Sequence, residues 1–117
     1  MSTVPVRLSA TLIVRNEANH LRRCLTSLRP LVDETIVVDT GSSDDSRSVA
    51  SSFGARVFEF PWTGDFSAAR NHALAQATGS WILYIDADEV ARAIDPSALK
   101  AQLADPTLVA ATVRFRN

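Results

Sequence analysis

The stretch WILYIDADEV, residues 81–90, combines the two features that decide the fold. It begins with five mostly apolar residues, as a buried strand does, and Asp86-Ala87-Asp88-Glu89 follow at once. Three carboxylates at the end of an apolar run repel one another and are costly to bury. We therefore expect a strand that ends at an open edge of the molecule, where a positive partner can reach the acids.

The composition around this stretch is that of one soluble globular domain. The chain has 117 residues, 46% of them hydrophobic and 21% charged, which is enough for a core but not for two domains. A net charge of −1 gives no reason to expect a nucleic-acid partner. The single cysteine, Cys24, excludes an intrachain disulfide and favours the cytoplasm. No apolar run approaches the roughly 18 residues that span a bilayer.

Working outward from residues 81–85, strand and helix patterns alternate along the chain. Leu21, Cys24, Leu25 and Leu28 recur at helical spacing between two apolar, β-branched runs. This alternation predicts an α/β fold with a mostly parallel sheet and helices on both faces. The expected strands are 8–14, 34–39, 55–60, 81–85 and 108–115, and the expected helices are 18–28, 44–53, 67–77 and 96–103.

Polar segments follow each of the first four expected strands. These segments are 15–17, 39–45, 61–65 and 86–89. In a parallel sheet the carboxyl ends of the strands share one edge, and ligands bind there. A scaffold without a ligand would not need so many acids at that edge, so we interpret it as a binding site.

Asp86 and Asp88 are the candidate metal ligands. If the segment stays extended, their side chains point the same way and Ala87 points away. Converging carboxylates suit a hard divalent cation such as Mn²⁺ or Mg²⁺, which one or two carboxylates hold together with phosphate oxygens and water. The positive partner of the acids is thus expected to be a metal that brings a phosphate with it.

Two further residues are expected near the same ligand. Asp39 ends the second strand, where a carboxylate can accept hydrogen bonds from a ribose or a base. Arg70 lies early in the third helix and can pair with phosphate, with a base carbonyl or with Asp65. The chain has neither GxGxxG after its first strand nor GxxxxGK[ST], which disfavours a nicotinamide or flavin site and a P-loop.

At this point three segments resemble a known family. They are LSATLIVRNEANHLRRCLTSL, ETIVVDTGSSDDS and FPWTGDFSAARNHALAQATGSWILYIDADE. Together, over roughly residues 8–90, they resemble family 2 glycosyltransferases with the GT-A fold, a Rossmann-like arrangement. The pattern W-x-G-D-F-S-x-A-R-N looks like the subset that includes bacterial lipopolysaccharide-core glucosyltransferases.

The resemblance implies a nucleotide-sugar donor, usually linked to UDP, and Mn²⁺ or Mg²⁺ as cofactor. It also implies an inverting transfer to a glycan or lipid-linked acceptor of the cell envelope, at the inner face of the bacterial membrane. By matching positions, Asp39 contacts uracil, Val14 and Glu17 line the nucleotide, Arg70 lies near base and phosphates, Asp86 lies near ribose and metal, and Asp88 binds the metal.

The family's catalytic base lies on a later segment than any that this chain matches. We therefore expect residues 1–117 to form one truncated domain, the nucleotide-sugar-binding part of a transferase, weak or inactive alone. The catalytic base stays unassigned. A half sheet with an open edge can pair with a second copy, so a homodimer is a reasonable expectation.

Two alternatives stay open from the residues. One is a nucleotide-binding module without catalysis, which would share the site but not the chemistry. The other is an aspartate-nucleophile phosphatase, because Asp86, Asp88 and Val90 fit its D-x-D-x-[TV] motif. That enzyme needs a lysine and an acidic pair downstream, whereas this chain has Lys100 and no Asp-Asp pair after residue 88.

Overall fold

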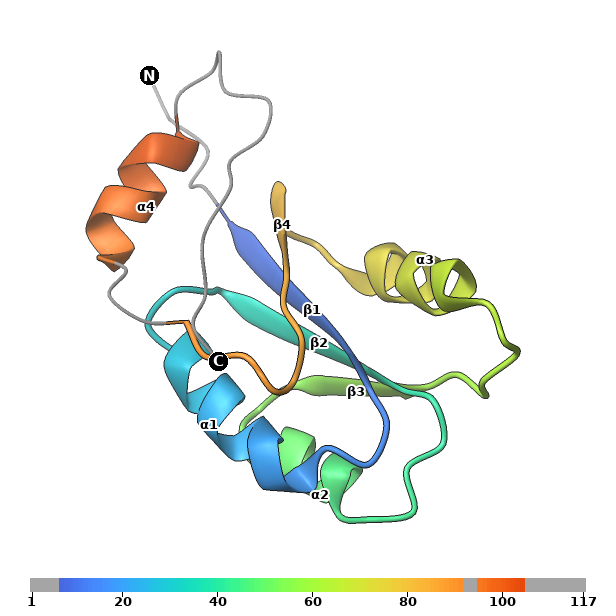
Figure 1. The fold of residues 1–117 in the computed structure, drawn as a ribbon. Coiled ribbons are helices and arrows are strands. Elements are labelled where there is room, and N and C mark those ends of the chain that lie inside the picture. Colours follow the sequence, from blue (N-terminus) through green and yellow to red (C-terminus); the bar gives the residue numbers. More distant parts are fainter. Residues whose placement is uncertain (1–6, 92–94, 105–117) are drawn as a thin grey trace.

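Four strands in a single sheet form the centre of the fold (Figure 1). The computed structural model describes residues 7–91 and 95–104. Strands and helices alternate throughout these residues, as the sequence predicts. The elements are β1 (Leu8–Val14), α1 (Ala18–Leu28), β2 (Glu34–Asp39), α2 (Ser46–Ser52), β3 (Arg56–Glu59), α3 (Phe66–Gln76), β4 (Trp81–Tyr84) and α4 (Pro96–Leu103).

All strand pairs in the sheet are parallel, and the strand order is β3-β2-β1-β4. The chain builds the sheet outward from β1 through β2 to β3 and then crosses back to place β4 on the other side of β1. The direction of winding therefore reverses between β1 and β4. In open α/β sheets, the crevice for a ligand forms at this reversal, beyond the carboxyl ends of the strands.

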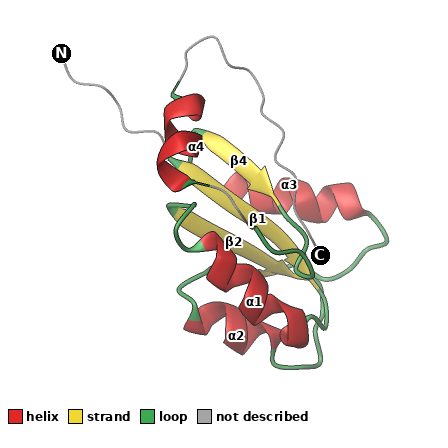
Figure 2. Ribbon diagram, turned by 60° about the vertical axis from the view of Figure 1, so that its left-hand side comes forward, coloured by secondary structure: helices red, strands yellow, loops and turns green. Residues whose placement is uncertain are grey.

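Helices cover both faces of the sheet, which confirms the expected α/β architecture (Figure 2). On one face, Leu12 and Val14 of β1 pack in a cluster that includes buried side chains of α1, α2 and α4. On the other face, Ile36 and Val38 of β2 pack against Ala73 of α3. Alternate side chains of each strand thus face different helices, as the period of two requires. No helix among the described residues is long and apolar enough to cross a membrane.

The predicted element boundaries are correct or nearly so. Helix α2 is shorter than the expected 44–53, because the Asp44 carboxylate accepts hydrogen bonds from the Ser46 N–H and hydroxyl just before the helix begins. The next strand is 56–59 rather than 55–60, α3 is 66–76 rather than 67–77, and β4 ends one residue early. The strand predicted at 108–115 lies outside the described residues.

A polar cluster closes the edge of the sheet opposite the polar segments. Glu34 Oε2 accepts hydrogen bonds from the Ser9 hydroxyl at 2.6 Å and from the Thr78 hydroxyl at 2.7 Å. The Ser9 hydroxyl oxygen in turn accepts one from the Gly79 N–H at 2.8 Å. This cluster joins the starts of β1 and β2 to the turn before β4. Its members are occupied with one another, so this edge has a structural role.

The stability of the protein should depend on pH through Glu34. Burial by itself raises the pKa of this carboxyl, but hydrogen bonds from Ser9, Thr78 and Arg56 outweigh it and lower the pKa from 4.5 to about 2. Because the folded-state pKa lies below the unfolded one, the stabilisation is complete above pH 4.5 and is lost as the pH falls toward 2.

Urea denaturation of the wild type and of Glu34→Gln, repeated across this pH range, measures the effect. We expect Glu34→Gln to lower the free energy of unfolding by about 1–3 kcal/mol at pH 7, because the donors around Glu34 lose a charged acceptor. The gap between the two proteins should close near pH 2. A gap that is the same at both ends of the range would contradict the assignment.

Gly79 should not tolerate a side chain. A Cβ atom there would lie 2.5 Å from the Ser9 hydroxyl oxygen, 2.8 Å from the Ser9 backbone nitrogen and 3.0 Å from the Arg7 carbonyl oxygen. Two of these neighbours are backbone atoms of the sheet edge and cannot rotate away. Gly79→Ala should therefore lower the free energy of unfolding by about 1–3 kcal/mol, as overpacking does. An unchanged denaturation midpoint would show that the edge can shift at no cost.

Candidate functional site

The acids of residues 86–89 form a tight turn after β4. The Glu89 N–H donates to the Asp86 carbonyl at 2.9 Å, and the Asp86 N–H donates to Glu89 Oε1, also at 2.9 Å. The backbone therefore does not stay extended, which corrects the condition on which we based the convergence of the two aspartates. The side chains are nevertheless separated as expected, since those of Asp86 and Asp88 are exposed whereas Ala87 is buried.

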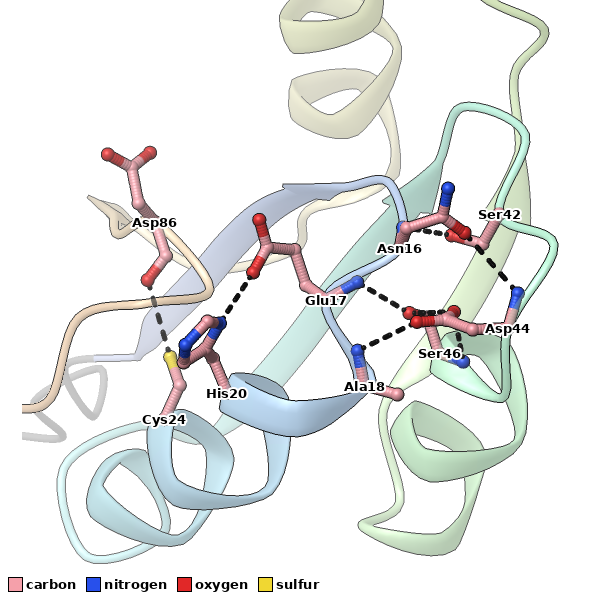
Figure 3. Close-up of polar contacts among 9 residues, drawn as sticks. All are labelled: Asn16, Glu17, Ala18, His20, Cys24, Ser42, Asp44, Ser46 and Asp86. Carbon is pink, nitrogen blue, oxygen red and sulfur yellow. Dashed lines mark hydrogen bonds and ion pairs between the residues drawn. The ribbon is translucent and has the colours of Figure 1, made fainter.

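Cys24 of α1 lies beneath this turn (Figure 3). Its thiol is fully buried and donates to the Asp86 carbonyl oxygen at 3.6 Å. Burial raises the pKa of Cys24 to about 12, and the negative charges of Glu89, Asp88 and Asp86 add to the increase. At neutral pH the thiol keeps its proton and its donor function. Cys24 is thus a core residue, as expected, that also supports the backbone of the turn.

Asn16 joins the end of β1 to the loop after β2 (Figure 3). Its backbone N–H donates to the Ser42 hydroxyl oxygen at 2.9 Å. Its side-chain oxygen accepts from the backbone N–H groups of Ser43 at 2.8 Å and Asp44 at 3.3 Å. Asn16 has φ = 54°, a left-handed conformation that asparagine tolerates better than most residues. One residue thus ties together two of the polar segments.

Asp39 is buried at the end of β2, paired in register with Val14. Its Oδ1 accepts hydrogen bonds from the backbone N–H groups of Gly41 at 2.9 Å and Ser42 at 2.8 Å, which shapes the loop that follows. Its Oδ2 is buried and has no partner within the described part of the chain. A buried acceptor without a donor is costly, so this oxygen is suited to a donor that a ligand brings.

A hollow of about 480 Å³, here called the carboxylate hollow, lies at the winding reversal between β1 and β4. It contains Asp86, Asp88 and Glu17, so three acids from two segments share it. The carboxylate of Glu17 also accepts from His20 Nδ1 at 3.0 Å. The remaining lining residues are Ile13, Val14, Arg15, Thr40, Trp62, Phe66 and Ala87.

A second hollow of about 230 Å³, here called the Arg70 hollow, adjoins the first. The two share Ile13, Phe66 and Asp86. The Arg70 guanidinium lies over two aromatic rings, with its central carbon 4.9 Å from the Phe66 centroid and 4.8 Å from the Tyr84 centroid. The pairing with Asp65 that the spacing allows is not among the ion pairs of the described residues. Asp65 caps α3, with Oδ1 accepting from the Ser67 N–H at 2.9 Å.

The donor set of the carboxylate hollow fits a divalent metal that is shared with a ligand. Asp86 and Asp88 offer hard oxygen atoms to the solvent, the kind that Mn²⁺ and Mg²⁺ prefer. Within residues 7–91 and 95–104, no three His, Cys, Asp or Glu side chains gather around one point that could hold a metal. A metal at these two aspartates would therefore take its other ligands from water and from a bound phosphate.

The chain matches the sequence model described as Glycosyl transferase family 2 over residues 9–117. The chain belongs to glycosyltransferase family 2. This result establishes the family to which the segments at 8–90 point, and it leaves the phosphatase alternative without support. The narrower resemblance to lipopolysaccharide-core enzymes is not established by the match.

Relatives and solved structures are similar to this chain over most of its length. It is 48% identical over 107 residues to a TPR repeat-containing protein of Synechococcus elongatus, covering 92% of this chain and 27% of that protein. Residues 1–349 of S. aureus TarS superpose with a TM-score of 0.70 and 25% identity, covering 85% of this chain and 32% of that solved chain. The expected GT-A fold is thereby confirmed.

A third similar structure was solved with ligands. The glucosyl-3-phosphoglycerate synthase of Mycobacterium tuberculosis, in complex with Mn²⁺, UDP and glucosyl-3-phosphoglycerate, superposes with a TM-score of 0.64 and 31% identity. The match covers 73% of this chain and 34% of the synthase. The same enzyme was also solved with Mg²⁺ and UDP. This chain spans about a third or less of the length of the Synechococcus relative and of each of the two solved chains.

The structure brings most of the predicted site residues together. Val14, Glu17, Asp86 and Asp88 line the carboxylate hollow, and Arg70 lines the hollow beside it. Asp39 is adjacent to Val14 but is not on the wall of either hollow. The individual roles of these residues stay predictions.

Sequence reasoning left several lining residues without a role. Motifs in the sequence do not indicate Thr40, Ile13 or Tyr84, and they favour packing over a sugar or base pocket for Trp62 and Phe66, although each of these two is 45% exposed and lines a hollow. Thr40 and Trp62 follow predicted strands, Phe66 begins α3, and Ile13 and Tyr84 lie near the carboxyl ends of β1 and β4, so position at the site edge is the signal that indicates all five. Glu89, which the sequence shows as the third acid after the fourth strand, hydrogen-bonds the backbone of its own turn.

Asn16 allows a test of how the edge is assembled. Asn16→Ala removes the acceptor for the Ser43 and Asp44 N–H groups and disfavours the positive φ, so it should destabilise the protein by about 1–3 kcal/mol. Asn16→Gly also lacks the acceptor but accepts the backbone conformation, and should recover about 1 kcal/mol of that loss. Chemical denaturation gives both values. Wild-type stability for Asn16→Ala would contradict this role.

Proposed function

We propose that this chain binds the nucleotide-sugar donor of a metal-dependent glycosyltransferase, and that the donor is a UDP-sugar. The observation that carries the proposal is the pair of exposed aspartates, Asp86 and Asp88, in one hollow at the winding reversal of a parallel sheet. The complex of the similar mycobacterial synthase with Mn²⁺ and UDP supports both the metal and the nucleotide.

The proposed roles of the residues follow from their positions in the site. Asp86 and Asp88 hold the metal, which, when bound, neutralises the charge of a diphosphate leaving group as a Lewis acid. Val14 and Glu17 line the nucleotide, and Arg70 adds a positive charge from the adjoining hollow. Asp39 offers its unpaired oxygen to the base, which requires a small opening of the loop above it.

The acceptor side of the reaction is proposed from the family resemblance. It is transfer with inversion to a cell-envelope glycan, such as the lipopolysaccharide core, at the inner face of the bacterial membrane. No described residue is assigned as the catalytic base. Glu89 is a poor candidate because its carboxylate already accepts a hydrogen bond from the Asp86 N–H. Mass spectrometry of lipopolysaccharide core incubated with a UDP-hexose and the enzyme tests the transfer, NMR of the product gives its anomeric configuration, and a product of retained configuration would contradict the proposal.

A homodimer is proposed through the open edge of the sheet. Within the described residues, β4 pairs with β1 alone, so its other side has unpaired backbone groups. Such an edge can pair with the same edge of a second copy. Light scattering at high protein concentration measures the mass, and a monomer there would count against the dimer.

Binding of UDP tests the donor site directly. Calorimetric titration should show UDP binding that is strengthened by Mn²⁺, and Asp88→Asn should weaken the Mn²⁺-dependent binding by at least about tenfold, because a metal ligand is lost. Asp45→Asn serves as the matched control, since Asp45 is an exposed acid of the same edge that lines neither hollow. GDP in place of UDP tests the base.

Fluorescence gives a second readout of the same titration. Trp62 lines the carboxylate hollow, whereas the Trp81 indole donates to the Leu103 carbonyl away from it. UDP should therefore change the emission of a Trp81→Phe variant, in which Trp62 is the remaining tryptophan. Folded protein that binds no UDP with either Mn²⁺ or Mg²⁺ would refute the proposed donor site. Binding without any sugar transfer by the full-length protein would favour the non-catalytic alternative.

A further inference from the structure

The fold alone does not explain the contacts of the Arg70 side chain. Its guanidinium forms no ion pair with any acid in the part of the chain that the structure describes. Instead it lies against two rings, Phe66 at 4.9 Å and Tyr84 at 4.8 Å from the ring centroids. Phe66 is four residues earlier on α3, and Tyr84 is the last residue of β4. The arginine thus bridges a helix and a strand through ring contacts.

Neither ring belongs to the hydrophobic core. Phe66 and Tyr84 are each 45% exposed, and together with Trp62 they are the large hydrophobic side chains that are exposed among residues 7–91 and 95–104. All three line one or both hollows. Exposed aromatic rings that gather at a concave, charged site are better explained by a ligand than by packing.

Contact with aromatic rings changes what an arginine can do. A guanidinium that lies on a ring face keeps its N–H donors free at its edge, where they can bind a phosphate in bidentate fashion. The rings also restrict a long side chain that would otherwise lose rotational freedom when a ligand binds. An arginine held in this way is prepared for an anion before the anion arrives.

We propose that Phe66 and Tyr84 form an aromatic clamp that positions Arg70 to contact the diphosphate of the donor. The inference rests on the proposed function, because the donor occupies the carboxylate hollow. Phe66 and Asp86 line that hollow as well as the Arg70 hollow, so the clamp is next to the metal-binding acids. Tyr84 lines the Arg70 hollow alone and acts through the arginine, as a positioning residue.

Tyr84 is the residue to change, because Phe66 also lines the nucleotide side. Tyr84→Leu removes the ring, and Tyr84→Phe keeps it as the matched control. With Mn²⁺ present, Tyr84→Leu should weaken UDP binding about two- to fivefold, the range for an exposed cation–π contact, and Tyr84→Phe should stay within twofold of the wild type. The thermal midpoint of Tyr84→Leu should stay close to that of the wild type, since an exposed side chain is lost.

Two further measurements separate positioning from a general effect. In an Arg70→Gln background, Tyr84→Leu should no longer weaken UDP binding, because the group that the ring holds is gone. Uridine, which lacks the diphosphate, should bind wild type and Tyr84→Leu equally in an NMR titration. The loss of UDP affinity that is due to the clamp is the part that requires both Arg70 and the diphosphate.

The outcomes are distinct. Wild-type affinity of Tyr84→Leu for UDP overturns the clamp and leaves the donor site standing. A loss that persists in the Arg70→Gln background, or that is equal for uridine, also overturns it, because the ring then acts without the arginine or the phosphate. Failure of the wild type to bind UDP with Mn²⁺ refutes the donor site and the clamp together.

Discussion

Parallel pairing of β1 on both of its sides is the constraint on which the rest of the structure depends. β1 is hydrogen-bonded to β2 on one side and to β4 on the other, and all three run in the same direction. Their carboxyl ends must therefore meet at one edge. This geometry brings residues 15–17, 39–42 and 86–89 together although they are far apart in sequence, and it leaves a hollow where the winding reverses.

The acids at this edge of the sheet have different environments. Asp44 and Glu89 are used in loop and turn hydrogen bonds, and one oxygen of Asp39 is used in the same way. Asp86 and Asp88 make no such side-chain bonds among those found in the described residues and face the solvent. The acids that could repel one another are thus divided into structural and free ones, and the free ones share a hollow with an arginine nearby.

Much of this arrangement could be predicted from the sequence, because its signals are local. Apolar, β-branched runs and three-to-four spacing predict β1, α1 and β2 at their observed limits, and Asp95 followed by Pro96 predicts the start of α4. The polar segments that follow the strands predict which edge of the sheet contains the site. The sequence pattern leaves open whether residues 86–89 stay extended, because the geometry of this turn depends on where the Glu89 side chain points. Likewise, no spacing rule brings Tyr84 to Arg70, since their contact arises from how α3 lies across β1 and β2.

The segment 61–65 between β3 and α3 is exposed along its whole length. Its last residue, Asp65, caps α3 through bonds to the helix itself, so the helix start does not rely on the rest of the loop. The loop can therefore change in length and composition without disturbing the sheet. Since Trp62 of this loop lines the carboxylate hollow, a change in the loop would reshape the wall of the hollow while the sheet stayed constant.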